Sequence, residues 1–398
     1  MIVSSAQAFA QQLDQIGRRD LPIGSGARGI DVSGYYAYIP CGYSGLQIFN
    51  IMYPNGPTYA GGYDTPGYAN DVAVKDSLAF VADDEEGLQV INVANPSAPE
   101  SLGHFSVSWA QCIDVQGNYA YLSNALGSHK IVDISDPANP ILAATCYAYG
   151  LASDIQAVDS MLFILTNASS PSIMGLYIFN IADPYSPFEL GHETEYTLNI
   201  GRALHVLGDY AYIVTSGVSL KIDDVSDPVH PENVFSYSTP GHRWDIYGQD
   251  NRVYLATDEP SLQVIDIYNP LDPQFVGSAF TAGTAYGIQV VGQYFYVAAD
   301  SALQIFKFRT GECDYVPGDV NGSGIFNGLD VTYAILWLRG RPYAPPDVCD
   351  CPPHGIIYAA ADANGSCAFN GMDITFMINH LMFGGIRFCP DCPPVDWP

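Results

Sequence analysis

The fold is decided by the stretch Leu88-Gln-Val-Ile-Asn-Val93 together with the segment Asn95-Pro96-Ser97-Ala98-Pro99 that follows it. The first part is a short apolar run with β-branched residues, which is typical of a buried strand. The second part contains two prolines, which cannot donate to a β ladder and therefore mark a turn. Upstream, residues 71–82 (DVAVKDSLAFVA) supply two further strand-like segments. One such unit predicts several antiparallel strands joined by tight turns.

This unit occurs seven times along the chain. Four short antiparallel strands fit into the 41 to 47 residues that separate successive units, a period typical of one blade of a β-propeller. The strand corresponding to residues 88–93 begins at Leu46, Leu88, His129, Leu176, Leu220, Leu262 and Leu303. We therefore expect an all-β, seven-bladed β-propeller over residues 11–309.

The seventh unit is incomplete, because it ends after residues 303–308 (LQIFKF) without the proline turn and last strand of the others. Residues 12–20 (QLDQIGRRD) align with residues 273–280 (PQFVGSAF), the strand that follows the sixth turn. The N-terminal strand is therefore expected to close the ring, which would remove an exposed sheet edge. A strand donated by another molecule is the alternative, and it would give polymers.

The motifs at residues 88–93 (LQVINV), 131–137 (IVDISDP) and 262–267 (LQVIDI) resemble those of the LVIVD-repeat family of prokaryotic surface propellers. The resemblance covers residues 11–309. It implies a propeller in an extracellular setting, and it brings no catalytic motif. Function must therefore be argued from a site rather than from the fold.

Composition limits the partners of the chain. Its 398 residues include 42 acidic and 14 basic ones, which gives a formal charge of −28. Such a surface repels nucleic acid and anionic headgroups and attracts cations. Insertion into a membrane is not expected either, because no run of 18 apolar residues occurs. Residues 1–10 (MIVSSAQAFA) look like the remnant of a signal peptide, which predicts secretion; a disordered terminus is the alternative.

Cysteines are concentrated at the C-terminal end of the chain, a pattern typical of proteins from oxidising compartments. Six of the nine lie in the last 86 residues, namely Cys313, Cys349, Cys351, Cys367, Cys389 and Cys392. Disulfides are the preferred interpretation. Zinc is the alternative for the two closely spaced pairs, although no nearby histidine has a matching spacing.

Aspartates recur at positions expected to face the central channel, which the first strand of each unit should line. They are Asp31, Asp71, Asp114, Asp154 and Asp245. Carboxylates facing one another across a channel raise each other's pKa unless a cation lies between them. We therefore predict an axial Ca²⁺ site that uses some of them. The alternative is that each accepts hydrogen bonds from neighbouring backbone amides. The acidic loop at residues 83–86 is a further, peripheral candidate.

Two similar twelve-residue loops, at residues 319–330 and 362–373, follow a linker at residues 310–318. Each has oxygen-bearing side chains at positions 1, 3, 5, 9 and 12, a spacing that lets a loop wrap a hard cation with a backbone carbonyl from position 7. Each leads into an apolar segment expected to be helical, at residues 331–338 and 374–383.

This duplication resembles a dockerin, an EF-hand-like calcium-binding module, over residues 314–386, and we expect a small α-helical domain at residues 319–398. The resemblance implies that Ca²⁺ is the bound ion and that a cohesin-like domain is the partner. Two departures from the family are the serine at position 5 of each loop and Cys367 in place of the turn glycine. The implied ligands are Asp319, Asn321, Ser323, Ile325, Asn327 and Asp330 in the first loop, and Asp362, Asn364, Ser366, Ala368, Asn370 and Asp373 in the second.

Catalysis is not the expected function. The sequence holds no G-x-S-x-G or HExxH motif, and its histidines are scattered, with His205 the candidate that faces the channel. We expect a secreted, calcium-binding structural or interaction protein, held at the cell surface by its dockerin-like end. One alternative is a head-to-tail, calcium-stabilised filament made of copies of this chain. The other is a propeller-type hydrolase or lyase anchored to a cohesin scaffold.

Overall fold

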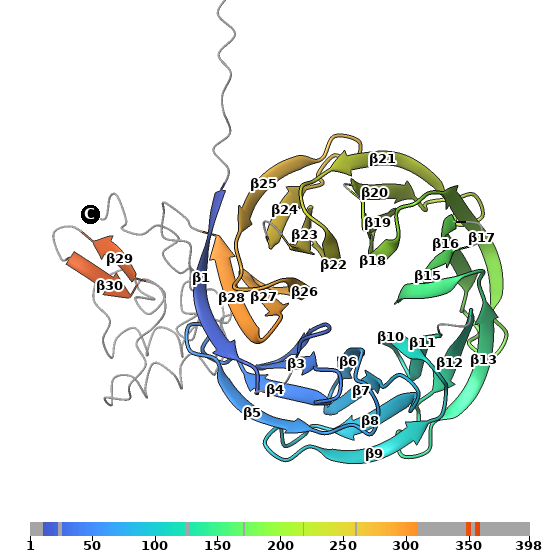
Figure 1. The fold of residues 1–398 in the computed structure, drawn as a ribbon, viewed down its shortest axis with the longest axis horizontal. Coiled ribbons are helices and arrows are strands. Elements are labelled where there is room, and N and C mark those ends of the chain that lie inside the picture. Colours follow the sequence, from blue (N-terminus) through green and yellow to red (C-terminus); the bar gives the residue numbers. More distant parts are fainter. Residues whose placement is uncertain are drawn as a thin grey trace, which may run out of the picture.

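The computed structural model describes residues 11–22, 26–124, 127–169, 172–217, 219–258, 261–308, 348–351 and 355–358. Sheets that are antiparallel within each blade form a closed ring around a central axis (Figure 1). Five blades are separate four-stranded sheets, and an eight-stranded sheet contains the other two. The prediction of an all-β, seven-bladed propeller is therefore confirmed. The segments 331–338 and 374–383, where helices are expected, lie outside the described residues.

The blades follow one another in chain order. Blade 1 comprises β2 (Asp31–Ser33), β3 (Tyr36–Pro40), β4 (Leu46–Asn50) and β5 (Thr58–Tyr63). Blade 2 comprises β6 (Asp71–Lys75), β7 (Leu78–Ala82), β8 (Leu88–Asn92) and β9 (Glu100–Phe105). Blade 3 comprises β10 (Ala110–Gln116), β11 (Tyr119–Asn124), β12 (Ser128–Asp133) and β13 (Ile141–Tyr147). Blade 4 comprises β14 (Leu151–Val158), β15 (Met161–Ser169), β16 (Ser172–Asn180) and β17 (Phe188–Tyr196).

The remaining blades have the same plan. Blade 5 comprises β18 (Gly201–Leu207), β19 (Tyr210–Thr215), β20 (Ser219–Asp224) and β21 (Glu232–Ser238). Blade 6 comprises β22 (Arg243–Gln249), β23 (Arg252–Thr257), β24 (Leu262–Asp266) and β25 (Gln274–Ala279). Blade 7 comprises β26 (Ala285–Val291), β27 (Tyr294–Ala299), β28 (Ala302–Phe308) and β1 (Gln11–Asp20). A separate hairpin of β29 (Val348–Cys351) and β30 (Gly355–Tyr358) lies between the two predicted calcium loops in sequence.

The turn between the third and fourth strands has the same cap in the first six blades. The third strand ends in Asn or Asp, whose side-chain oxygen accepts a hydrogen bond of 2.8–3.0 Å from the backbone N–H two residues later. Such Asx turns are why these residue types recur before each proline turn. The capping residues are Asn50, Asn92, Asp133, Asn180, Asp224 and Asp266.

The N-terminal strand closes the ring. β1 pairs antiparallel with β28, from Leu13 opposite Phe308 to Asp20 opposite Ala302, and is therefore the outermost strand of blade 7. It occupies the position that its alignment with residues 273–280 predicts. Gly17 lies against the proline turn of blade 1, where an added Cβ would overlap the carbonyl oxygen of Pro54. Likewise, a Cβ added at Gly61 of blade 1 would overlap the carbonyl oxygen of Pro96 in blade 2. β1 therefore packs against the next blade in the same way as the outer strand of blade 1.

The core lies between the blades. Leu262 and Val264 of blade 6, for example, pack in one cluster with Val297 and Phe306 of blade 7, and all four side chains are fully buried. Burial of each such side chain stabilises the fold by roughly 1.5–3 kcal/mol. Neighbouring blades are therefore joined by apolar contacts that depend on both partners.

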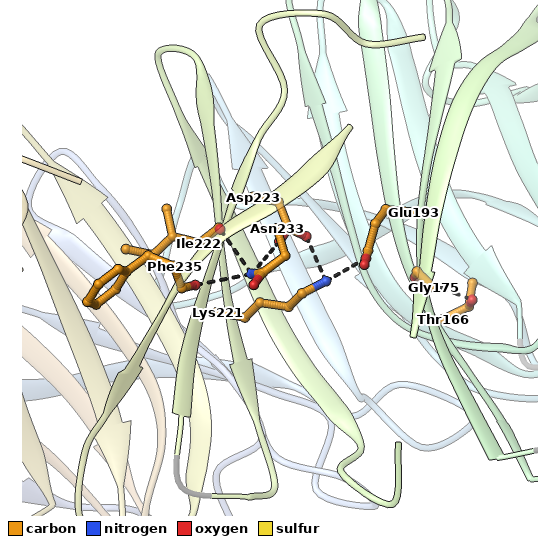
Figure 2. A network of polar contacts seen from close by, with 8 residues as sticks. All are labelled: Thr166, Gly175, Glu193, Lys221, Ile222, Asp223, Asn233 and Phe235. Carbon is orange, nitrogen blue, oxygen red and sulfur yellow. Dashed lines mark hydrogen bonds and ion pairs between the residues drawn. The ribbon is translucent and has the colours of Figure 1, made fainter. Parts of the chain in front are cut away.

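One interface, between blades 4 and 5, also contains a buried ion-pair network (Figure 2). Lys221 on β20 contacts Glu193 on β17 of blade 4 at 2.5 Å and Asp223 on its own strand at 3.1 Å. Asn233 donates a hydrogen bond of 3.0 Å to Asp223. Burial of charged groups is favourable only when each of them is paired, and Lys221, Glu193 and Asp223 meet this condition.

Candidate functional site

The site with the most converging polar side chains is a cavity of about 320 Å³ on the propeller axis. The first strand of every blade lines it, and each of these inner strands contacts the inner strands of the two neighbouring blades. All five aspartates predicted to face the channel line this cavity, namely Asp31, Asp71, Asp114, Asp154 and Asp245. The placement of the inner strand and of these residues therefore follows the prediction.

The five aspartates lie in two tiers. Asp71, Asp154 and Asp245 form the first tier, within the first four residues of their inner strands, and Asp31 and Asp114 form the second, two residues further along the repeat. In the first tier, one carboxylate oxygen accepts the N–H of the following residue and the other accepts an N–H of the next blade. For Asp71 these donors are Val72 at 2.8 Å and Ile113 at 3.0 Å.

Polar side chains of this kind link every pair of neighbouring blades. Asp and Gln side chains accept backbone N–H groups of the next blade at six junctions, and at the seventh the His205 ring packs against Gly248, where an added Cβ would overlap it. Starting from blade 1, the linked residues are Asp31 and Val74, Asp71 and Ile113, Asp114 and Ala157, Asp154 and Leu204, His205 and Gly248, Asp245 and Ile288, and Gln289 and Val32.

Burial changes the ionisation of these carboxyl groups. Burial raises the pKa of Asp71 to about 7 and that of Asp245 to about 6, and it raises the pKa of Asp154 well above its usual range. Backbone hydrogen bonds oppose the effect at Asp71, while the charges of Asp245 and Asp31 add to it. The pKa values of Asp31 and Asp114 are also raised, chiefly by burial. Part of the channel charge is therefore neutralised by protons near neutral pH.

The geometry supports the interpretation in which these aspartates accept backbone hydrogen bonds. Across the described ranges, no group of three or more His, Cys, Asp or Glu side chains is arranged to hold a metal ion. In the acidic loop, Asp83 is buried and accepts hydrogen bonds from the Thr65 hydroxyl at 2.6 Å and the Gly67 N–H at 2.8 Å, so it also fixes backbone. The axial Ca²⁺ site stays a prediction.

His205 lies in the second tier, as expected. Its ring packs 5.1 Å from that of Tyr247, and burial lowers its pKa to about 4, so it is neutral at physiological pH. Its contacts join blade 5 to blade 6. They give this histidine a structural explanation that requires no catalysis.

The sequence did not predict a third ring of side chains, which lies at the start of the inner strands. In blades 4 to 7 a β-bulge places one extra residue just before the first-tier position: Ser153, Arg202, Trp244 and Tyr286. A bulge re-aims the side chain of the extra residue, and all four line the cavity. Together with Arg28, Asn70 and Gln111 of blades 1 to 3 they form what we call the entrance ring.

The two halves of the entrance ring carry side chains of different chemistry. Arg202, Trp244, Tyr286 and Arg28 follow one another over blades 5, 6, 7 and 1, while blades 2, 3 and 4 contribute only amides and a hydroxyl. The Arg202 guanidinium lies over the Trp244 ring at 4.7 Å, and the Trp244 and Tyr286 ring centroids are 5.1 Å apart. The Arg28 guanidinium lies over the Tyr68 ring at 5.0 Å.

The predicted calcium ligands of the C-terminal loops, from Asp319 to Asp330 and from Asp362 to Asp373, lie outside the described residues. So do the side chains of the six C-terminal cysteines, while Cys41, Cys112 and Cys146 of the propeller are free thiols. The described residues contain no helix that is long and apolar enough to cross a membrane.

Solved structures with the same architecture have very different sequences. The crystal structure of the RRP9 WD40 repeats has a TM-score of 0.59 and 7% identity, covering 75% of this chain and all of that one. The WD40 β-propeller domain of Doa1 has a TM-score of 0.58 and 10% identity, covering 74% of this chain and 96% of that one. The computationally designed Ika8 protein has a TM-score of 0.57 and 10% identity, covering 74% of this chain and 100% of that one. At such identities the likeness shows the fold alone.

No curated protein sequence matches the chain. The family model of the LVIVD repeat matches residues 24–65, 66–106, 109–148, 201–239, 240–281 and 282–306. The unmatched interval contains blade 4, in which three strands have nine residues each. The matched repeats cover more than half of the sequence and coincide with six blades of the ring, so the chain belongs to the LVIVD-repeat family.

Proposed function

We propose that this protein is a secreted, calcium-binding β-propeller with a structural or interaction role, assembled at the cell surface through its C-terminal region. The propeller is the rigid body in this proposal, and the paired C-terminal loops are the attachment. A structural or interaction role fits a β-propeller repeat protein. Secretion, calcium binding and the dockerin-like attachment rest on the sequence.

The observation that carries the structural role is the set of seven links between blades. The aspartates and glutamines of the two tiers accept backbone N–H groups of the next blade, as Asp71 does from Ile113 and Asp245 from Ile288. These contacts lie where a propeller enzyme would place reacting groups. The channel chemistry thus holds the ring together, which favours a rigid platform.

Calcium binding is supported by the duplicated loop pattern. The loops at residues 319–330 and 362–373 have the same spacing of oxygen-bearing side chains, and each has a carboxylate at positions 1 and 12. The formal charge of −28 also favours cations near the protein. Two carboxylates in each loop predict a modest affinity, suited to the millimolar calcium of an extracellular medium.

Two partners are compatible with this proposal. The dockerin-like region binds a cohesin-like domain of a separate scaffold, or it binds the propeller of the next copy and forms a head-to-tail filament. A head-to-tail contact joins two different surfaces and does not close on itself, so it gives a fibre. Electron microscopy of the purified full chain with Ca²⁺ and with EDTA separates the two. Fibres that dissolve in EDTA support the filament, and single particles in both conditions support a separate scaffold.

Calcium titration of the full-length chain by isothermal titration calorimetry tests the proposal directly. The unmodified chain should bind one ion for each C-terminal loop, and the double variant Asp319→Asn/Asp362→Asn should lose both, because each substitution removes the position 1 carboxylate. Asp136→Asn, at an exposed turn of the propeller, is the matched control and should bind as the unmodified chain does. Equal stoichiometry in the double variant would contradict calcium binding by the loops.

A further inference from the structure

We propose that the entrance ring of the channel binds a sugar acid, a pyranose ring that carries one carboxylate. The proposal concerns the ligand of the propeller and does not depend on the C-terminal calcium loops. It rests on the juxtaposition of two stacked arginines, an aromatic pair and an arc of amide and hydroxyl groups around one cavity.

The arginines supply the anion site. Arg28 and Arg202 both line the cavity, and among the described residues neither guanidinium forms an ion pair. Each lies over an aromatic ring, Arg28 over Tyr68 and Arg202 over Trp244, and this cation–π contact favours one position of the guanidinium before a ligand arrives. A preorganised guanidinium fork matches a carboxylate, because its parallel N–H groups can bind both oxygens. Unpaired arginines are a notable feature in a chain with only 14 basic residues.

The aromatic residues lie between the two arginines along the ring. Trp244 and Tyr286 belong to neighbouring blades, and both are half-buried, so part of each side chain is accessible. Aromatic rings in ligand pockets pack against apolar ligand surface, and a pyranose offers such surface on the side where several of its C–H groups point. The Trp244 indole N–H is buried and has no hydrogen-bond partner within the described residues.

The opposite arc suits hydroxyl groups. Blades 2, 3 and 4 contribute Asn70, Gln111 and Ser153 to the entrance ring. Asn70 and Gln111 are already oriented, because their amide groups donate to the Ala110 carbonyl at 3.0 Å and to the Asp84 carboxylate at 3.3 Å. Their side-chain carbonyl oxygens are the groups that would accept ligand hydroxyls.

The charge below the entrance ring limits the ligand to a single anionic group. The first-tier carboxyl groups of Asp71, Asp154 and Asp245 line the deeper part of the cavity. The fraction of these groups that is ionised repels a second negative charge, and the carboxyl oxygens accept hydrogen bonds from hydroxyl groups. A polyphosphate or a dicarboxylate is therefore disfavoured relative to a polyol with one carboxylate. The cavity volume of about 320 Å³ is at the small end of ligand pockets, roughly 300–1,000 Å³, which favours one sugar unit or a chain end.

Calorimetric titration of the full chain with D-galacturonate tests the proposal. EDTA is present throughout, so that a calcium bridge to the C-terminal loops cannot contribute. D-galacturonate should bind, and D-galactose, which has the same ring without the carboxylate, should bind at least about tenfold more weakly, since a carboxylate–guanidinium pair is worth that much. Inorganic phosphate, an anion without a ring, should also bind more weakly. Trigalacturonate tests the source of the ligand, because only its terminal unit would enter the cavity and its other carboxylates would stay outside. Binding tighter than that of the monomer identifies a polysaccharide end, and equal or weaker binding identifies a free sugar acid.

Variants separate this site from adventitious binding. Arg28→Gln/Arg202→Gln should weaken D-galacturonate at least about tenfold, and Trp244→Phe should weaken D-galacturonate and D-galactose alike. Arg252→Gln is the matched control, because Arg252 also stacks on an aromatic ring, that of Phe308, but does not line the axial cavity. Thermal melting of each variant checks that it is folded. Absence of D-galacturonate binding to the unmodified chain, tighter binding of phosphate, or equal affinity in the folded arginine variant overturns the proposal.

Discussion

Replacing Asp71 by asparagine should change the pH dependence of propeller stability. Burial raises the pKa of this carboxyl group from 3.8 to about 7. The folded protein thus binds this proton more tightly than the unfolded chain does. The stabilisation from the protonated form is fully present below about pH 4 and is lost as the pH rises to about 7. One pKa unit corresponds to about 1.4 kcal/mol, so the loss between pH 4 and pH 8 is at most about 4 kcal/mol.

The asparagine variant removes this titration and one hydrogen bond. Its side-chain oxygen can still accept one of the two N–H groups that Asp71 binds, those of Val72 and Ile113. The other N–H is left unpaired, a cost of about 1–3 kcal/mol that does not depend on pH. The variant should therefore be less stable than the unmodified protein at pH 4. As the pH rises to 8, the unmodified protein loses up to about 4 kcal/mol of stability and the variant does not. The stability difference between the two proteins should therefore change by that amount in favour of the variant.

Urea unfolding followed by tryptophan fluorescence measures this difference. The full chain and the variant are compared between pH 4 and pH 8 in EDTA, with Asp76→Asn as the control, because Asp76 is exposed at the turn between β6 and β7 of the same blade. The control should keep the profile of the unmodified protein. Parallel profiles for Asp71→Asn and the unmodified protein would refute the reasoning. Repeating the series with Ca²⁺ tests the axial site, since stabilisation at pH 8 that Asp71→Asn abolishes would support it.

Three further perturbations have defined outcomes. Lys221→Met leaves the buried Asp223 carboxylate without its cation and should lower the free energy of unfolding by about 3–5 kcal/mol. Urea unfolding measures this loss, and a value below about 1 kcal/mol would contradict the prediction. Leu13→Asp puts a charge into the apolar cluster that joins β1 to blades 6 and 7, so the melting temperature should fall and β1 should become sensitive to protease. The control Gln15→Glu, at an exposed position of the same strand, should change neither property. Burial lowers the pKa of His129 to about 4, below its value in the unfolded chain. The free energy of unfolding should therefore fall by up to about 3 kcal/mol as the pH drops from 6.5 to 4. Thermal melts of His129→Gln should show a flatter pH dependence over this range.

The sequence predicts the blades well because each of them is a local pattern. The third strand of blade 2, its capping residue Asn92 and the proline turn after it are contiguous, and the structure has them as the pattern indicates. The same is true of the closing strand, because the seventh unit lacks one strand and β1 supplies it. The inward direction of Asp71 and Asp114 also follows from the period of two along a strand.

The entrance ring could not be predicted in the same way. Its members in blades 4 to 7 point to the axis because of a bulge, and the bulge depends on how the start of each inner strand meets the second strand. The stacking of Arg202 on Trp244 joins two blades whose relative position is set by packing far from either residue. The hydrogen bond from Ile113 to Asp71 likewise depends on the phase between two blades. A large aromatic residue or an arginine directly before the channel position of blades 1, 5, 6 and 7 is the local signal that was available.

The pairing of β1 with β28 has a consequence for biosynthesis. Leu13 leaves the ribosome about 300 residues before its partner Phe308, which at roughly 5–20 residues per second is a delay of about 15–60 s. During that interval six blades can form one after another, but the ring stays open and the first strand has no partner. Closure of the ring, by pairing of β1 with β28, is therefore the last event in the folding of the propeller. Any pause or truncation before blade 7 leaves an unpaired strand at each end, both able to capture a neighbouring chain.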